Sequence, residues 1–150
     1  MKIHFKLLAT AALFAGSQAI AADGLIAVKS PLKAKATMDR LESVVKEKGL
    51  NVFARIDHAA GAMKVGKTLR PTEVLIFGNP QGGTPLMECA QSAGIDLPLK
   101  ALVWEDAAGQ TWIGYNDPEY LAKRHDAGSC AVVPNMSKAL AGFVQATVAP

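Results

Sequence analysis

The feature that most restricts the fold is a pair of strand patterns separated by a short turn. Residues 97–106 and 111–116 both have the composition of strands, and 107–110 between them has the length and glycine content of a hairpin connection. Strands joined by such a turn are antiparallel neighbours. Further strand patterns precede this pair at 24–29, 51–57 and 71–78. The chain is therefore expected to build a mainly antiparallel sheet.

A helical pattern follows the first strand. Between 34 and 48, Met38, Leu41 and Val45 recur at helical spacing and form one apolar stripe. Gly49 comes directly afterwards, where the end of a helix favours a residue with positive φ. This segment is expected to pack its stripe against the sheet.

The remaining helices are shorter or lie near the end of the chain. Residues 79–83 have the composition of a turn. Thr84 is expected to cap a short helix that has Pro85 in its first position and ends at Gly94. Other helical segments are expected at 58–66, 117–125 and 134–148.

These elements predict one α+β domain over residues 22–150, with helices packed on one face of the sheet. Alternation within strands then divides the apolar side chains between two faces. We expect Val52, Ala54 and Ile56 under the helices, and Phe53, Leu75 and Phe77 with one tryptophan on the open face. A face that exposes several large apolar groups is typical of a contact surface. A homodimer is its most economical explanation.

The first 21 residues have the pattern of a cleaved export signal. Lys2 and Lys6 precede an apolar run of about ten residues, too short for a membrane span of about 20, and Ala19 and Ala21 fit the cleavage rule. A membrane anchor is the alternative that this length disfavours. Removing two of sixteen basic residues leaves fourteen against thirteen acidic ones, a net charge of +1. We expect a periplasmic or secreted protein without a membrane anchor, and no nucleic-acid partner.

Cys89 and Cys130 are the two cysteines of the chain. In an exported protein, two cysteines favour one structural disulfide. Two buried thiols, or one reactive thiol, are the alternatives. Neither cysteine lies in a C-x-x-C motif or beside a histidine, so redox catalysis is not expected.

Polar side chains gather at the predicted strand ends. The candidate ligand-binding residues are Arg55, Asp57, His58, Glu73, Asn79 and Tyr115, with Asn116 beside them. If the strands at 51–57 and 71–78 are neighbours, Arg55 and Glu73 can form an ion pair. A carboxylate beside His58 could orient its imidazole for acid–base work. The alternative is structural: Asp57 caps the next turn, and His58 packs or binds backbone.

Other chemistry has weaker support. His58 and His125 lack the spacing of metal-binding motifs, and Met63 and Met87 are more typical of core packing than of a copper site. The glycine-rich segment 78–84 lacks the lysine of a phosphate-binding loop. No metal and no cofactor are therefore expected, and no serine-hydrolase motif is found.

Several segments resemble the family called domain of unknown function 302. The resemblance covers about residues 24–126 and is carried by 53–62, 69–80, 83–87, 93–100, 103–106 and 115–118. It implies a β-α-β(4)-α fold, here with extra short helices, and often a dimer, but no established activity. Residues 128–134 depart from the family pattern. Because Cys130 lies there and Cys89 in a family-like helix, the resemblance modestly favours their pairing.

Two functional hypotheses follow. The first is an exported, non-enzymatic domain that dimerises or binds a small ligand beside the sheet, with the polar residues lining that surface. The alternative is a periplasmic enzyme that uses His58 with Asp57 or Glu73 as acid and base. An open pocket with His58 bonded to a carboxylate would favour the enzyme, and internal ion pairs would favour the binding domain.

Overall fold

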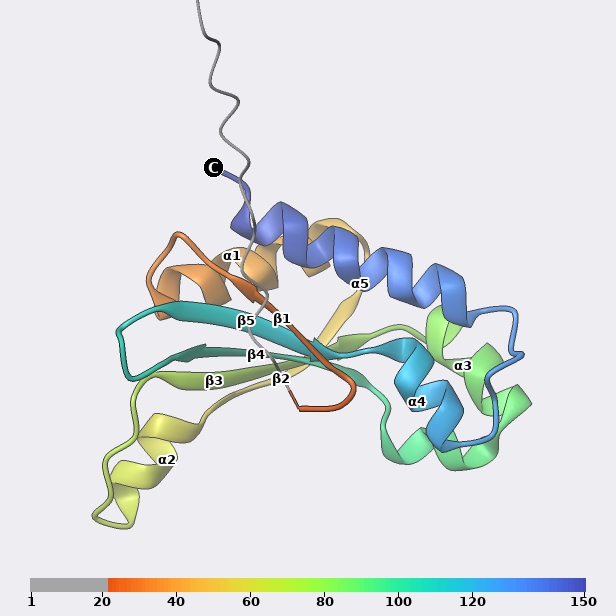
Figure 1. The fold of residues 1–150 in the computed structure, drawn as a ribbon, viewed down its shortest axis with the longest axis horizontal. Coiled ribbons are helices and arrows are strands. Elements are labelled where there is room, and N and C mark those ends of the chain that lie inside the picture. Colours follow the sequence, from red (N-terminus) through yellow and green to blue (C-terminus); the bar gives the residue numbers. More distant parts are fainter. Residues whose placement is uncertain (1–21) are drawn as a thin grey trace, which may run out of the picture.

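The computed structural model describes residues 22–150, and the predicted export signal lies outside them. Five strands form one antiparallel sheet in the order β1-β5-β4-β3-β2 (Figure 1). Their bounds are Leu25–Lys29, Asn51–Asp57, Thr72–Gly78, Leu99–Glu105 and Thr111–Asn116 for β1 to β5. The predicted α+β fold and the β4–β5 hairpin are thereby confirmed.

Two long helices cover one face of the sheet. Helix α1 (Ala34–Glu47) and helix α5 (Val133–Val148) lie side by side above it (Figure 1). Met38, Leu41 and Val45 of α1 are fully buried, as their spacing predicts. Gly49 follows the end of α1 with a φ of +76°. The main core therefore lies between this helical layer and the sheet.

A bulge in β2 decides which strand residues face the helices. The pairing between β2 and β3 shifts register between Val52 and Ala54, and such a bulge reverses the alternation of side chains beyond it. Val52 packs against the core under the helices, whereas Ile56 is 42% exposed. Arg55, not its neighbours, then shares the helical side with its pairing partner Leu75.

The prediction of which residues lie on the open face was wrong. Leu75 and Phe77 are fully buried beneath α1 and α5. Alternation therefore places the other set on the opposite side, which we call the open face: Ala54, Ile56, Val74, Ile76, Leu102, Trp104 and Trp112. A sheet with an uncovered apolar side is thus present, but Ala54 and Ile56 belong to it and Leu75 and Phe77 do not.

Short helices build the two ends of the domain. Helix α2 (His58–Lys64) follows β2 and projects away from α1 and α5 (Figure 1). At the opposite end lie α3 (Pro80–Cys89), the 3₁₀ helix η1 (Gln91–Ile95) and α4 (Pro118–Arg124). In the described part of the chain, none of the helices has both the length and the apolar character that crossing a bilayer requires.

The start of α3 differs from the prediction. Asn79 caps the helix by accepting a hydrogen bond from the Gly82 amide at 2.8 Å, and Pro80 is its first residue. Thr84 and Pro85 lie inside the helix instead of opening it. Asn79-Pro80 and Thr84-Pro85 are both cap-and-proline pairs, and the earlier pair begins the helix.

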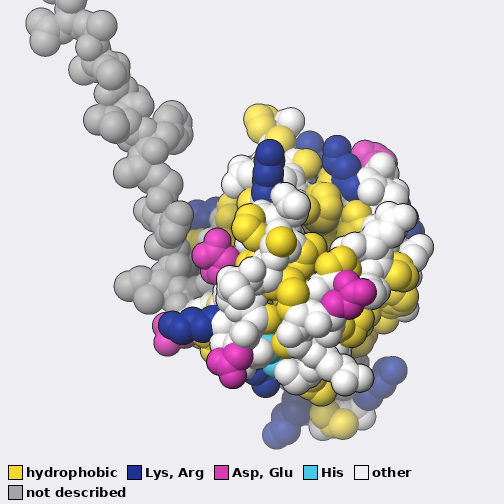
Figure 2. Space-filling view, turned by 90° about the vertical axis from the view of Figure 1, so that its right-hand side faces the viewer, with side chains coloured by type: hydrophobic (Ala, Val, Ile, Leu, Met, Phe, Trp, Pro, Cys, Tyr) yellow, Lys and Arg dark blue, Asp and Glu magenta, His cyan; other side chains and the backbone are white. Residues whose placement is uncertain are grey.

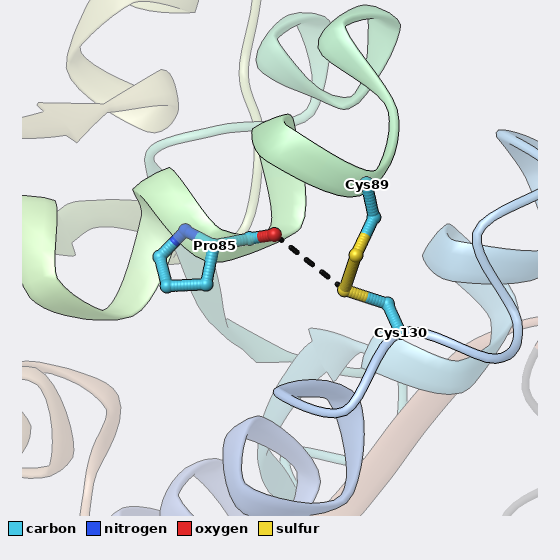
Figure 3. The surroundings of a disulfide bond; sticks show 3 residues. All are labelled: Pro85, Cys89 and Cys130. Carbon is cyan, nitrogen blue, oxygen red and sulfur yellow. Dashed lines mark hydrogen bonds between the residues drawn. A yellow bond between two sulfur atoms is a disulfide. The ribbon is translucent and has the colours of Figure 1, made fainter.

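The predicted disulfide joins Cys89, at the end of α3, to Cys130 before α5 (Figure 3). Their Cα atoms are 6.0 Å apart, within the normal range for a bridge. The Cys130 sulfur also lies 3.5 Å from the Pro85 carbonyl oxygen, a contact only, since a bridged sulfur has no proton to donate. A second apolar cluster, including Leu86 and Met136, packs around this bridge.

Candidate functional site

Arg55 stands at the centre of a charged group that we call the arginine cluster: Arg55, Asp39, Glu42 and Glu73. Its guanidinium donates two hydrogen bonds to the Glu73 carboxylate on β3, as the strand pairing predicted. The same group donates to Asp39 at 2.7 Å and to Glu42 at 3.1 Å, both on α1. Arg55 is therefore occupied by carboxylates of its own chain.

Electrostatics hold the arginine cluster in its charged form. Hydrogen bonds from Lys35 and then Arg55 lower the pKa of Asp39, and those from Lys46 and then Arg55 lower the pKa of Glu42. The hydrogen bond to Glu73 chiefly raises the pKa of Arg55 further above its normal value. The cluster thus joins β2, β3 and α1 through charge-assisted hydrogen bonds at neutral pH.

Asp57 and His58 do not cooperate in the structure. The Asp57 side chain caps α2 by accepting a hydrogen bond from the Ala60 amide at 2.8 Å, which is the structural alternative considered for it. His58 is exposed at the start of α2, and within residues 22–150 it makes no hydrogen bond to a carboxylate. The geometry required for the acid–base hypothesis is therefore not assembled here.

The other predicted site residues are dispersed. Asn79 lies at the opposite end of β3 from Glu73 and uses its side chain to cap α3. Tyr115 on β5 is buried under the helices, and this burial, with the nearby charge of Asp117, raises its pKa. Asn116 is exposed at the end of β5. Arg55 and Glu73 are brought together, but the six residues do not form one site.

A pocket that the sequence did not reveal lies beside α3. We call it the end pocket; it has a volume of about 670 Å³ between α3, α5 and the adjoining end of the sheet. Small-molecule sites commonly have volumes of about 300–1,000 Å³. Figure 2 looks onto this end of the molecule, where hydrophobic side chains show between polar ones. Its lining includes Phe53, Asn79, Thr84, Met87, Leu97, Asn135, Ala139 and Phe143.

The local structure explains why this hollow exists. The bulge in β2 directs Phe53 toward the pocket, where its side chain remains 58% exposed. Gly82 and Gly83 form the first turn of α3 along the wall, and they leave it without side chains. Asn79, Thr84 and Asn135 add polar groups to an otherwise apolar lining. A mostly apolar cavity with a few polar groups is typical of a ligand site.

A second polar arrangement, also missed, surrounds His125. Its Nε2 lies 2.6 Å from Asp96 Oδ2 and its Nδ1 lies 3.0 Å from Ser92 Oγ, while Arg124 donates to Asp96. A serine, a histidine and an aspartate in one chain of hydrogen bonds resemble a hydrolase triad. A triad also needs a substrate site beside the serine, and Ser92 does not line the end pocket. We interpret this series of hydrogen bonds as a structural link between α4 and η1.

Comparison with known proteins supports a family relationship. A sequence profile described as "Domain of unknown function DUF302" matches residues 26–143. Proteins of Brucella suis biovar 1 (strain 1330) and Brucella abortus biovar 1 (strain 9-941), both named fluoride-specific ion channel FluC 1, are 49% identical over 105 residues. The match covers 70% of this chain but 41% and 39% of those proteins. This chain thus matches about two fifths of their length.

A solved structure has the same fold. The crystal structure of an uncharacterized conserved protein DUF302 from Bacillus stearothermophilus superposes with a TM-score of 0.76. The superposition covers 84% of this chain and 99% of the other, at 23% sequence identity. At this identity the likeness shows a shared fold and carries no residue role across.

Proposed function

Since the chain belongs to the DUF302 family, whose description assigns no activity, we propose a function from its own geometry: an exported, non-enzymatic domain that binds a small ligand in the end pocket. The observation that carries this proposal is the pocket itself, with its ligand-sized volume and mostly apolar lining. The bridge between Cys89 and Cys130 supports export, because such bonds persist in oxidising compartments.

The chemistry of the lining defines the ligand class. Phe53, Met87 and Phe143 offer apolar and aromatic contacts, whereas Asn79 and Asn135 are suited to one polar group. None of these side chains carries a charge. The favoured ligand is therefore a neutral or weakly polar molecule with an apolar body, held by burial of its surface and oriented by an amide.

Filling the pocket tests this proposal. Ala139 is an exposed residue of α5 on the pocket wall, so Ala139→Trp should occupy the space without disturbing the core. We expect the affinity for the neutral apolar dye N-phenyl-1-naphthylamine, measured by fluorescence titration, to fall about tenfold or more, in line with losing contacts worth about 1.4 kcal/mol.

Ala141→Trp is the matched control, because Ala141 is exposed on the same helix but does not line the pocket. It should bind the dye as the parent does. Equal binding by the Ala139→Trp variant would contradict the proposal. If the Ala139→Trp variant binds the dye more weakly, native mass spectrometry of protein purified from the periplasm should identify any ligand that the parent retains and this variant lacks.

The open face supports homodimerisation as a second property. Ile56 at its edge is 42% exposed, and Leu102 and Trp104 near its middle are half-buried. A second copy of the chain could cover this apolar surface by a symmetric contact. The open face and the end pocket are built from different residues, so the two proposals can be tested separately.

Two other activities are not part of this proposal. The relatives named as channels share about two fifths of their length with this chain, and we propose no channel activity for it. Acid–base catalysis by His58 stays a prediction. It is not proposed here, because the carboxylate of Asp57 accepts a hydrogen bond from the backbone and that of Glu73 from Arg55.

A further inference from the structure

The segment between β2 and β3 forms an apolar and basic projection, and its last residues, Leu69 and Arg70, border the open face in a pocket that they share with Leu102 and Trp104. We call residues 58–71 the basic arm; it comprises α2 and the turn that leads into β3. The arm points away from the helical layer (Figure 1), and α2 contains no buried residue. Its side chains therefore contribute little to the core of the domain.

Large apolar side chains of the arm are unusually exposed. Met63 is 68% exposed, Val65 73% and Leu69 52%. A helix of seven residues is only marginally stable by itself, so keeping three such groups in water on a small projection has a cost without a folding benefit. This exposure indicates a surface that becomes covered by something else.

The charge of the arm indicates the chemical class of the partner that covers it. Lys64, Lys67 and Arg70 are exposed and alternate with the apolar residues, and no acidic residue occurs between Asp57 and Glu73. Figure 2 shows basic and hydrophobic side chains together at the lower tip of the molecule. The arm is thus locally +3, while the whole chain after signal removal is nearly neutral. An anionic partner with an apolar interior complements it.

We propose that the basic arm docks on the surface of an anionic lipid bilayer, with Met63, Val65 and Leu69 entering the headgroup boundary and Lys64 and Lys67 binding lipid phosphates. Neither the apolar side chains nor the basic residues are sufficient alone. Short apolar insertions bind a bilayer reversibly, and a basic patch adds attraction to anionic headgroups. Their combination on one projection allows docking without a membrane-spanning segment.

Vesicle sedimentation tests this docking directly. We expect the mature protein to bind vesicles of equal parts phosphatidylcholine and phosphatidylglycerol at least about tenfold more tightly than pure phosphatidylcholine. Each basic residue near an anionic surface contributes roughly fivefold to such binding. The double variant Lys64→Glu and Lys67→Glu should therefore lose at least about tenfold in affinity for the anionic vesicles.

A second variant separates the apolar contribution. Replacing Met63, Val65 and Leu69 with serine should remove the binding that persists at on the order of 0.5 M salt, where attraction between exposed charges is screened. Ile95→Ser and Lys138→Glu are the matched controls, because both residues are exposed and lie outside the arm. Both should bind as the parent does, and thermal unfolding should show that every variant remains folded.

Three outcomes would overturn the proposal. One is equal binding to anionic and neutral vesicles, and another is an equal loss of binding in the two control variants. The third is a change of self-association in the arm variants without lipid, measured by light scattering, which would assign the arm to a second copy of the chain. Dye binding in the end pocket should be the same in all of these variants, so this test and that of the proposed function can fail independently.

Discussion

At the scale of single residues, Arg55 shows what strand pairing can and cannot predict. Its ion pair with Glu73 follows from two neighbouring antiparallel strands and was expected from the sequence. Asp39 and Glu42 could not be expected in the same cluster, because their position depends on how α1 crosses the sheet. The candidate site was thus partly predicted where contacts are local to paired strands, and missed where they depend on tertiary packing.

The arginine cluster makes a prediction about stability. Arg55→Met should lower the free energy of unfolding at pH 7 by about 1–2 kcal/mol, since it removes charge-assisted hydrogen bonds that solvent partly screens and leaves three carboxylates close together. Urea unfolding measures this loss. Lys138→Met, which alters an exposed lysine of α5, should change stability by less than about 0.5 kcal/mol.

The stability that Arg55→Met loses should depend on pH. The folded-state pKa values of Asp39 and Glu42 are lowered from 3.8 and 4.5, so their stabilisation is fully present above those unfolded-state values and is lost as the pH falls through the lower folded-state values. The difference between parent and the Arg55→Met variant should therefore shrink as the pH falls below 3.8. An unchanged difference in acid would show that the cluster stabilises the fold by packing alone.

At the scale of elements, α3 and its disulfide show where local signals compete. The sequence contains two cap-and-proline pairs, and Gly82 and Gly83 between them have low helix propensity. The helix nevertheless includes both glycines, because the Asn79 side chain caps its first turn by accepting a hydrogen bond from the Gly82 amide. The end pocket depends on this earlier start, and so it could not be predicted from a turn assigned to the same residues.

The disulfide should stabilise this end of the molecule more than the rest. Replacing Cys89 and Cys130 with serine should cost about 2–4 kcal/mol, because a bridge across 41 residues restricts the unfolded chain. Hydrogen exchange should increase in α3 and in the segment between α4 and α5 that contains Cys130, because the bridge joins these two parts, and much less in α1. The parent under reducing conditions is the control and should behave like the variant. Uniform exchange across the chain would contradict this local effect.

At the scale of the whole molecule, the sequence predicted the architecture better than the faces. One sheet, one helical layer and an uncovered side all followed from the periodicity of strands and helices. The bulge at Val52 and Ala54 then exchanged which residues of β2 lie on each side. A single irregularity of this kind reverses every later side chain of a strand, and no sequence pattern marks it here.

The corrected open face defines how dimerisation should be tested. Ile56→Lys places a charge on an exposed part of this face, where a symmetric contact would repeat the charge on both subunits. If the open face joins two copies, this variant should weaken the dimer at least about tenfold, measured by light scattering over a concentration series, since a charge buried without a partner is costly. Ile95→Lys is the matched control, because Ile95 is similarly apolar and exposed but lies in η1. A parent that stays monomeric at every concentration, or a control that weakens the dimer equally, would show that the open face is not where copies of this chain meet.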